Sequence, residues 1–420
     1  MMSKQAKIYT FGFNMVCRKF MRNNIACVFK EIADTKRTYL AQWYLDTPAI
    51  IPSDTYARWN RLQRLLYKAI WYYVGHFGEF EQIFPIPDVA RRVVDICRPY
   101  PYRIGTYRPD FLIDRSGQIK ICEIGARFPL NGYFMSGISE YIGTCNYPYV
   151  SYLERPEYER FLHYLFDYWG RFERLCVLKS ADKPCDIKYY TPFFEALGIP
   201  VHVLSPEQIK PSSPELANCA VVNELNQYDM ERLDDETLHA IAASNALNDM
   251  RTIFLIHDKR FLAVLSDAHF QSQCLEEDDI AFLRPYLIPT YTRLQNPELW
   301  HDARRQKDGW VLKHALLGKS EQVYVGCTCS EEEWEGVFAS PLIEAMVLQP
   351  FIRQQRLDST IGEHIYSDFV VGTLLCFDDC FLGPGIFRTS SFEVTNRVDD
   401  RKMAACFTDN YSGFADRFIL

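Results

Sequence analysis

The chain has 420 residues, of which 48% are hydrophobic and 15% aromatic, and its formal net charge is -8. This length exceeds what one compact core usually fills, and the apolar content excludes a disordered chain, so we expect several folded lobes. The acidic balance argues against a nucleic-acid-binding protein, because such proteins normally present a basic face.

The cysteine pattern and the apolar runs indicate the cellular compartment in which the protein is expected. Fourteen cysteines are scattered without an evident framework, and the first residues contain no apolar signal core. Both observations predict reduced thiols in the cytoplasm. The longest apolar runs, such as residues 253–256, fall far short of the roughly 20 residues that a spanning helix needs, so no membrane partner is expected.

The first part of the chain predicts two helices with a hairpin between them. Apolar side chains recur every three or four positions over residues 54–74, behind Asp54, which can cap a helix start. A second helix is predicted after Pro156, where large apolar side chains mark one face. Between the helices, residues 110–114 and 118–124 carry two short strand patterns joined by a turn.

From residue 174 the pattern changes to strands that alternate with helices. Strands are predicted at 174–178, 200–204, 219–223 and 252–256, with a helix over 187–197 that ends at Gly198. This alternation favours a small α/β lobe with a parallel sheet. After Pro289, strand patterns alternate with loops and predict an antiparallel lobe that covers a nucleotide.

The predicted hairpin concentrates charged residues at its open end. Asp110 begins the first strand and Glu123 nears the end of the second, so a tight hairpin brings the two carboxylates side by side. Such a pair is unfavourable unless a cation lies between them, and Mg²⁺ bound to ATP prefers one or two carboxylates. Arg108 and Arg127 flank the pair and can grip phosphate. From spacing alone, an ordinary surface hairpin with solvated ion pairs is an equally good interpretation.

Further polar residues follow in three later segments. Lys313 lies within an apolar strand, and Lys319 lies in a loop between Gly318 and Ser320 whose backbone N–H groups suit phosphate. This loop is not a Walker A motif, because it lacks the upstream glycine and the strand-to-helix setting. Asn131, in the turn after the hairpin, is a candidate metal ligand.

Three other residues are weaker candidates, since each taken alone is better explained as an ordinary surface residue. Lys259 lies where a predicted strand passes into a helix, and Gln349 precedes a proline where a linker can offer hydrogen bonds to adenine. Arg388 follows two glycines and can reach a transferring phosphoryl group. A zinc site made by Cys327, Cys329, Cys376 and Cys380 is a remoter alternative to buried free thiols.

Together these segments resemble the ATP-grasp superfamily, and specifically its circularly permuted branch typified by the synthetase domain of glutathionylspermidine synthetase. The motifs RPDF at 108–111, EIGAR at 123–127, HDKRFLAVL at 257–265, WVLK at 310–313, LQPFI at 348–352 and GPGIFRTS at 383–390 carry the resemblance. Their order is its most specific feature, because the carboxylate hairpin precedes the lysine strands here and follows them in unpermuted ligases.

The resemblance implies a mixed α+β and α/β fold, a circularly permuted ATP-grasp with a small parallel α/β lobe and a helical N-terminal region. The parts expected from it are a mainly helical region and possible substrate side (1–100), the hairpin part of the core (101–155), the α/β lobe (156–285) and the nucleotide-binding lobe (286–420).

The resemblance also implies roles for the site residues. Asp110 and Glu123 would hold magnesium. Where the permuted branch has Asn two residues after the glutamate, this chain has Gly125, and Asn131 is the candidate replacement. ATP would be bound by Lys259, Lys313, Lys319, Gln349 and Arg127. Arg108 would contact a phosphate, and Arg388 would steady the acyl phosphate.

The function that follows from the resemblance is an ATP-dependent carboxylate–amine ligase with ATP and Mg²⁺, acting on a small-molecule carboxylic acid and an amine. Two alternatives stay open: a nucleotide-binding protein without ligase activity, and an ATP-grasp phosphotransferase. The sequence predicts neither the identity of the acid and the amine nor the oligomeric state.

Overall fold

A computed structural model describes residues 30–31, 34, 42–146, 157–170, 172–181, 186–213, 216, 219–318, 320–395, 398–410, 412 and 418–420. The helices of this part are α2 (Ser53–His76), α3 (Asp88–Cys97), α4 (Tyr133–Asn146), α5 (Glu157–Trp169), α6 (Ile187–Ala196), α7 (Gln227–Arg232), α8 (Asp235–Ala243), α9 (Met250–Leu255), α10 (Phe261–Ser266), α11 (Ala268–Cys274), α12 (Glu277–Leu283), α13 (Pro297–Arg305) and α14 (Glu331–Ala339). The helices predicted at 54–74, after Pro156 and at 187–197 are thereby confirmed as α2, α5 and α6.

The strands form four sheets in the part of the chain that the structure describes. They are β1 (Ala49–Ile51), β2 (Thr106–Ile113), β3 (Ile119–Gly125), β4 (Leu175–Lys179), β5 (Val201–Leu204), β6 (Ala220–Glu224), β7 (Trp310–His314), β8 (Val323–Val325), β9 (Met346–Pro350), β10 (Arg356–Ile361), β11 (His364–Phe377), β12 (Cys380–Pro384), β13 (Phe387–Ser390), β14 (Arg401–Met403), β15 (Ala405–Phe407) and β16 (Phe418–Ile419).

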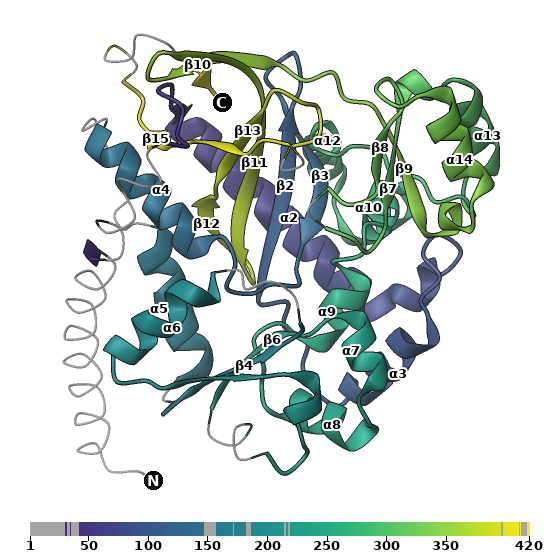
Figure 1. The fold of residues 1–420 in the computed structure, drawn as a ribbon. Helices are drawn as coiled ribbons and strands as arrows, with labels where there is room; N and C mark the ends of the chain where they lie inside the picture. The colour runs from purple at the N-terminus through teal and green to yellow at the C-terminus, as the bar shows by residue number, and fades with distance from the viewer. Residues whose placement is uncertain are drawn as a thin grey trace.

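The largest sheet stands at the centre of the molecule (Figure 1). Its strands run in the order β14-β13-β11-β2-β3, and β10 and β12 also pair with β11. The predicted hairpin is therefore confirmed as β2 and β3, and it is joined edge to edge with strands that lie more than 200 residues later in the chain. This pairing joins strands that are far apart in the sequence into one sheet.

One face of this sheet is covered by α2. The Trp59 ring of α2 lies 5.6 Å from the Phe111 ring of β2, measured between centroids. Phe111 in turn packs against Gly372 of β11, where an added Cβ would lie 2.2 Å from the Phe111 ring. Because side chains alternate along a strand, Asp110 points to the opposite face, away from α2.

A second sheet is parallel and lies below the central sheet in Figure 1. Its order is β5-β4-β6, so the predicted parallel α/β lobe is confirmed. The prediction of a further strand at 252–256 is wrong, because residues 252–255 belong to helix α9 and Ile256 follows its end. All six residues of α9 are buried, and a short, fully buried apolar run cannot be assigned to strand or helix from its periodicity.

A third sheet, β8-β7-β9, is antiparallel and lies at the right of Figure 1 with α13 and α14. Leu312 and Leu348 pack with Trp300 and Trp334 in a separate apolar core between this sheet and the two helices. The strands predicted after Pro289 therefore divide between this sheet and the central one.

A fourth small sheet, β15-β1-β16, joins β1 to the end of the chain through parallel pairs. The molecule is thus a mixed α/β protein with parallel and antiparallel sheets, in agreement with the predicted class. No helix in the described residues is long and apolar enough to cross a membrane. The predicted part boundaries at residues 100, 155 and 285 stay predictions.

Candidate functional site

The hairpin β2–β3 sets the two candidate metal ligands side by side. Asp110 and Glu123 are direct cross-strand partners. The register shifts immediately beyond this pair, between Asp110 and Phe111, so that Cys122 is the extra residue on β3. Both carboxylates are partly exposed, whereas Phe111 and Cys122 are buried. The local sequence therefore produces the juxtaposition that the spacing predicted.

Asp110 is held by its neighbours on the central sheet. The Thr373 hydroxyl of β11 donates a hydrogen bond of 2.9 Å to Oδ1 of Asp110. Withdrawal from bulk water and the charge of Glu123 raise the pKa of Asp110, against the opposing influence of Arg388 and Arg108. A carboxyl group in this state gains from a cation placed beside it.

Glu123 faces lysines from two other segments. Nζ of Lys259, in the link between α9 and α10, lies 3.5 Å from Oε2 of Glu123. Nζ of Lys313 on β7 donates to the Cys122 carbonyl at 3.4 Å. Burial raises the pKa of Glu123, but the charges of Lys259 and Lys313 outweigh it and hold this pKa below its ordinary value.

Arg388 shares the face of the central sheet that carries Asp110. Arg388 on β13 pairs with Val371, which lies two residues from Thr373 on β11. Side chains two residues apart on a strand point to the same face, so Arg388, Thr373 and Asp110 lie on one surface. The charge of Arg388 lowers the pKa of Asp110, which agrees with this placement.

Arg108 lies close to Gly125 on the neighbouring strand. Nη1 of Arg108 donates to the carbonyls of Phe128 and Asn131, at 2.7 and 2.9 Å. Arg108 and Gly125 are cross-strand partners, and a Cβ at residue 125 would lie 3.3 Å from Nη2 of Arg108. A side chain at residue 125 would therefore come into tight contact with the end of the Arg108 side chain.

Three of the predicted site residues lie apart from the carboxylate pair. Gln349 on β9 is 1% exposed and its amide donates to the Thr290 hydroxyl at 2.9 Å. The Arg127 guanidinium lies over the Phe128 ring, 4.5 Å from its centroid. Asn131 makes hydrogen bonds through its backbone, with its carbonyl accepting from Arg108 and its amide donating to Phe128. Lys319 lies outside the described residues. The roles of all these residues stay predictions.

The donor set around the carboxylates fits one divalent cation that shares its coordination with a substrate. The described residues contain no group of three or more His, Cys, Asp or Glu side chains that could hold a metal ion, which also leaves the four-cysteine zinc alternative without support. Two carboxylates are nevertheless what Mg²⁺ usually takes from a protein when phosphates complete its coordination.

Comparisons with known proteins show what the chain is similar to. The AnkG N-terminal domain family matches residues 62–255. The ATP-grasp enzyme ankG of Aspergillus thermomutatus is 28% identical over 197 residues, which are 41% of this chain and 40% of that relative. The match thus spans less than half the length of the relative.

A solved structure extends the likeness over most of the chain. The apo form of a glutathione synthetase-like effector from Globodera pallida has a TM-score of 0.53 and 9% sequence identity, and the match covers 87% of this chain and 90% of that chain. The chain is ATP-grasp-like. At this identity the effector indicates a shared fold alone.

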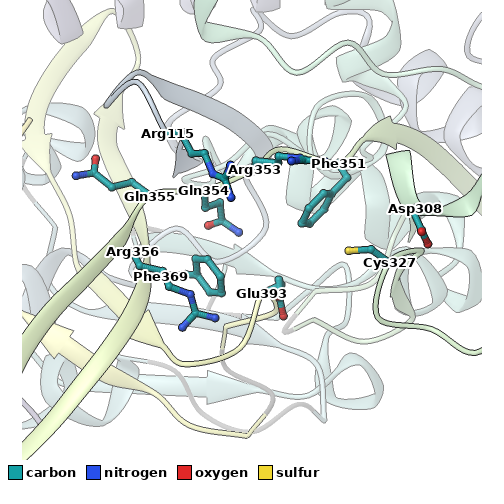
Figure 2. Close-up of a pocket in the computed structure, with 10 residues that line it drawn as sticks. All are labelled: Arg115, Asp308, Cys327, Phe351, Arg353, Gln354, Gln355, Arg356, Phe369 and Glu393. Atoms are coloured by element: carbon teal, nitrogen blue, oxygen red, sulfur yellow. The ribbon is translucent and has the colours of Figure 1, made fainter.

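The ATP-grasp-like chain also has a wide cavity, about 760 Å³ in volume. Figure 2 shows its lining, with Asp308 and Cys327 on one side and Gln355 and Arg356 on the other. Phe369 of the lining lies on β11, four residues from Thr373 and on the same face. At about 3.3 Å per residue, the cavity lies roughly 13 Å along β11 from Asp110.

Sequence reasoning missed four residues of this region. Thr373 and His257 were not singled out; His257 accepts a hydrogen bond of 3.3 Å from the Ala126 amide and stands within charge range of Glu123. Lys179 and Glu224 were also missed. They are the last residues of β4 and β6, and the rule that ligands bind at the carboxyl ends of parallel strands would have found them.

Proposed function

We propose that the protein is an ATP-dependent ligase that joins a carboxylic acid to an amine through an acyl phosphate. One observation carries the proposal: Asp110 and Glu123 are adjacent on one hairpin and meet Lys259, Lys313 and Arg388 from three distant segments. Carboxylates ringed by cations suit phosphoryl transfer, in which negative charge spreads over several oxygens.

Asp110 and Glu123 would hold magnesium, whose charge would offset that of the ATP phosphates. The direct pairing of Asp110 with Glu123 on β2 and β3 supports this assignment, because two adjacent carboxylates favour a cation between them. Thr373 would orient the Asp110 carboxylate through its hydrogen bond. Lys259, which is 5% exposed and already bonded to the Leu317 carbonyl, would present its charge to phosphate with little loss of side-chain freedom.

The proposed reaction has two steps. An oxygen of the substrate carboxylate attacks the γ-phosphorus of ATP, and ADP leaves as an acyl phosphate forms. The amine nitrogen then attacks the acyl carbon, inorganic phosphate leaves and the nitrogen loses one proton. Lys313 and Arg388 would stabilise the charge that builds on phosphoryl and acyl oxygens, acting by position alone.

The cavity of Figure 2 is our candidate for the nucleoside end of ATP. It lies on the same face as Asp110 and is bordered by Phe351, in the linker that follows β9. Gln349, the residue predicted to face adenine, is buried against Thr290, so Phe351 is the better candidate for contact with the base. Aromatic rings commonly pack against flat ligands of this kind.

The order of the motifs supports a permuted ATP-grasp, because the hairpin precedes β7 and β9 in sequence yet lies beside them in the site. A cytoplasmic location and small-molecule substrates belong to the same proposal.

Calorimetry of Mg²⁺–ATP binding, followed by an assay for ADP with candidate acids and amines, tests the proposed function. We expect Mg²⁺-dependent binding that Glu123→Ala abolishes, and ADP release that requires both substrates and yields an amide. Glu335→Gln, which changes an exposed carboxylate paired with Arg304, is the matched control and leaves binding intact. A protein that binds ATP but never forms an amide would contradict the ligase and leave a nucleotide-binding protein; a phosphorylated product would indicate a phosphotransferase.

A further inference from the structure

Lys179 and Glu224 form a buried charged pair at the end of the parallel sheet. They are the last residues of β4 and β6 and are direct partners in the register of these strands. The sheet has the order β5-β4-β6, so β4 is the central strand. The chain passes from β4 to β5 on one side of β4, and the next strand, β6, lies on the other side, so the direction of winding reverses at β4. Open α/β sheets bind ligands in the crevice that such a reversal leaves beyond the carboxyl ends of the strands.

The pair is incompletely satisfied. Nζ of Lys179 and Oε2 of Glu224 lie 3.8 Å apart, an ion pair without a hydrogen bond. Both atoms are buried and have no hydrogen-bond partner among the residues that the structure describes. The two residues are 8% and 1% exposed. Buried charged groups normally make hydrogen bonds, so this arrangement requires an explanation.

A structural role explains the pair poorly. Removing two charges from water is unfavourable, and a buried ion pair compensates for this only with good geometry and additional hydrogen bonds. An apolar pair at the ends of β4 and β6 would serve the lobe better. A ligand that accepts a hydrogen bond from Lys179 and donates one to Glu224 would supply what is missing.

The surroundings add a second cation and a route for a ligand. The Phe128 ring lies 5.9 Å from Nζ of Lys179 and 4.5 Å from the Arg127 guanidinium. Burial raises the pKa of Glu224 to about 7, while the charges of Lys179, Arg127 and Arg108 oppose this shift. Arg127 and Phe128 are partly exposed, so the cluster borders solvent on their side.

The other carboxylate nearby is already occupied. Asp186 accepts a hydrogen bond of 2.8 Å from the Gly132 amide, ahead of α4, and a longer one from the Met135 amide. Asp186 therefore fixes the loop that carries Phe128. Glu224 is left as the carboxylate that can receive a donor from a ligand.

We propose that Lys179, Arg127 and Glu224 bind the amino-acid group of a substrate, with its carboxylate toward Lys179 and Arg127 and its ammonium toward Glu224. The ligand class is a free α-amino acid. The proposal rests on the ligase function and names the substrate class of that site.

Arg108 connects this cluster to the carboxylate pair. Its charge acts both on Asp110 and on Glu224, so it lies within range of the two sites. His257 accepts a hydrogen bond from the Ala126 amide, beside Arg127, and it lies two residues before Lys259, which meets Glu123. A molecule held at Lys179 and Glu224 would thus extend toward the proposed position of the γ-phosphate.

Calorimetry and thermal shift with the twenty L-amino acids test this site, with and without Mg²⁺ and a non-hydrolysable ATP analogue. Each amino acid is compared with its decarboxylated amine and its N-acetyl derivative. We expect at least one amino acid to bind and both of its derivatives to bind at least tenfold more weakly. Failure of every amino acid to bind a protein that still binds Mg²⁺–ATP would overturn this site and leave the ligase proposal standing.

Variants separate binding from folding. Glu224→Gln and Lys179→Met are each expected to lower the affinity for the amino acid at least tenfold. The Mg²⁺–ATP affinity of each variant should stay within twofold of that of the parent protein. Glu195→Gln, at an exposed position of α6 in the same lobe, is the matched control and changes neither affinity. Folded variants that keep full affinity for the amino acid would disprove the assignment. Should they fail to fold, Glu224→Asp, which keeps the charge and shortens the side chain, gives the same comparison.

Trapping with hydroxylamine assigns the amino acid its place in the reaction. With ATP and Mg²⁺, an amino acid that acts as the acid yields a hydroxamate by itself, whereas one that acts as the amine yields none until a second acid is added. Either result supports the site. Absence of Mg²⁺–ATP binding would instead count against the proposed function itself.

Discussion

Thr373 is a single side chain whose effect on the carboxylate pair can be isolated. Its hydroxyl donates to Asp110 at 2.9 Å and lowers the pKa of Asp110. In Thr373→Val, which keeps the shape and removes the donor, we expect the pKa of Asp110 to rise. Mg²⁺–ATP affinity should fall roughly fivefold, the equivalent of about 1 kcal/mol for a lost hydrogen bond.

Calorimetric titration at a fixed Mg²⁺ concentration measures this change. Thr360→Val removes a comparable hydroxyl of the same sheet, one that donates to Asp46, and serves as the control. Equal Mg²⁺–ATP affinity in Thr373→Val and in the parent protein would show that Thr373 does not orient a metal-binding carboxylate.

At the scale of single elements, β2 and β11 owe their close approach to Gly372. An added Cβ at this position would lie 2.2 Å from the Phe111 ring, which is fully buried and packed against Trp59. Gly372→Ala must therefore displace a core aromatic ring, and we expect the free energy of unfolding to fall by about 1–3 kcal/mol. Urea denaturation measures the change.

Gly336 provides a comparison of opposite sign. It lies inside α14 at an exposed position, with no atom within 4 Å of an added Cβ. Because alanine loses less conformational freedom in a helix, Gly336→Ala should raise the free energy of unfolding by roughly 0.5–1 kcal/mol. If the free energy of unfolding changed in the same direction and by a similar amount in Gly372→Ala and Gly336→Ala, contact with Phe111 would not be the cause of the effect at Gly372.

For the whole molecule, buried carboxyl groups make stability depend on pH. Glu157 is 1% exposed and accepts a hydrogen bond from Ser136. Burial and the neighbouring charge of Glu140 raise the pKa of Glu157 well above its ordinary value of 4.5. The folded protein therefore holds a proton on Glu157 that the unfolded chain releases above about pH 4.5.

The sign follows from proton linkage: stability from this group is fully present below pH 4.5 and is lost as the pH rises toward the folded-state pKa. We expect the melting temperature to fall from pH 5 to pH 8. Glu157→Gln, which stays uncharged and can accept the Ser136 hydrogen bond, should flatten this dependence. If the melting temperature depended on pH equally in Glu157→Gln and in the parent protein, Glu157 would be excluded as the source of the pH dependence.

The sequence by itself determined the local features of this protein. The hairpin, α2, α5, α6 and the parallel strands follow from periodicity and turn residues, because these signals come from neighbours in the chain. The pairing of Asp110 with Glu123 was predicted for the same reason: 13 residues with a tight turn leave little choice of register.

Only the tertiary structure decided what faces that hairpin. Lys259, Lys313 and Thr373 reach it from segments 136, 191 and 263 residues away, and local patterns carry no information about such contacts. Residues 252–255, predicted as a strand, are part of the buried helix α9. Packing between distant elements, which no local signal encodes, therefore completes the site that the hairpin begins.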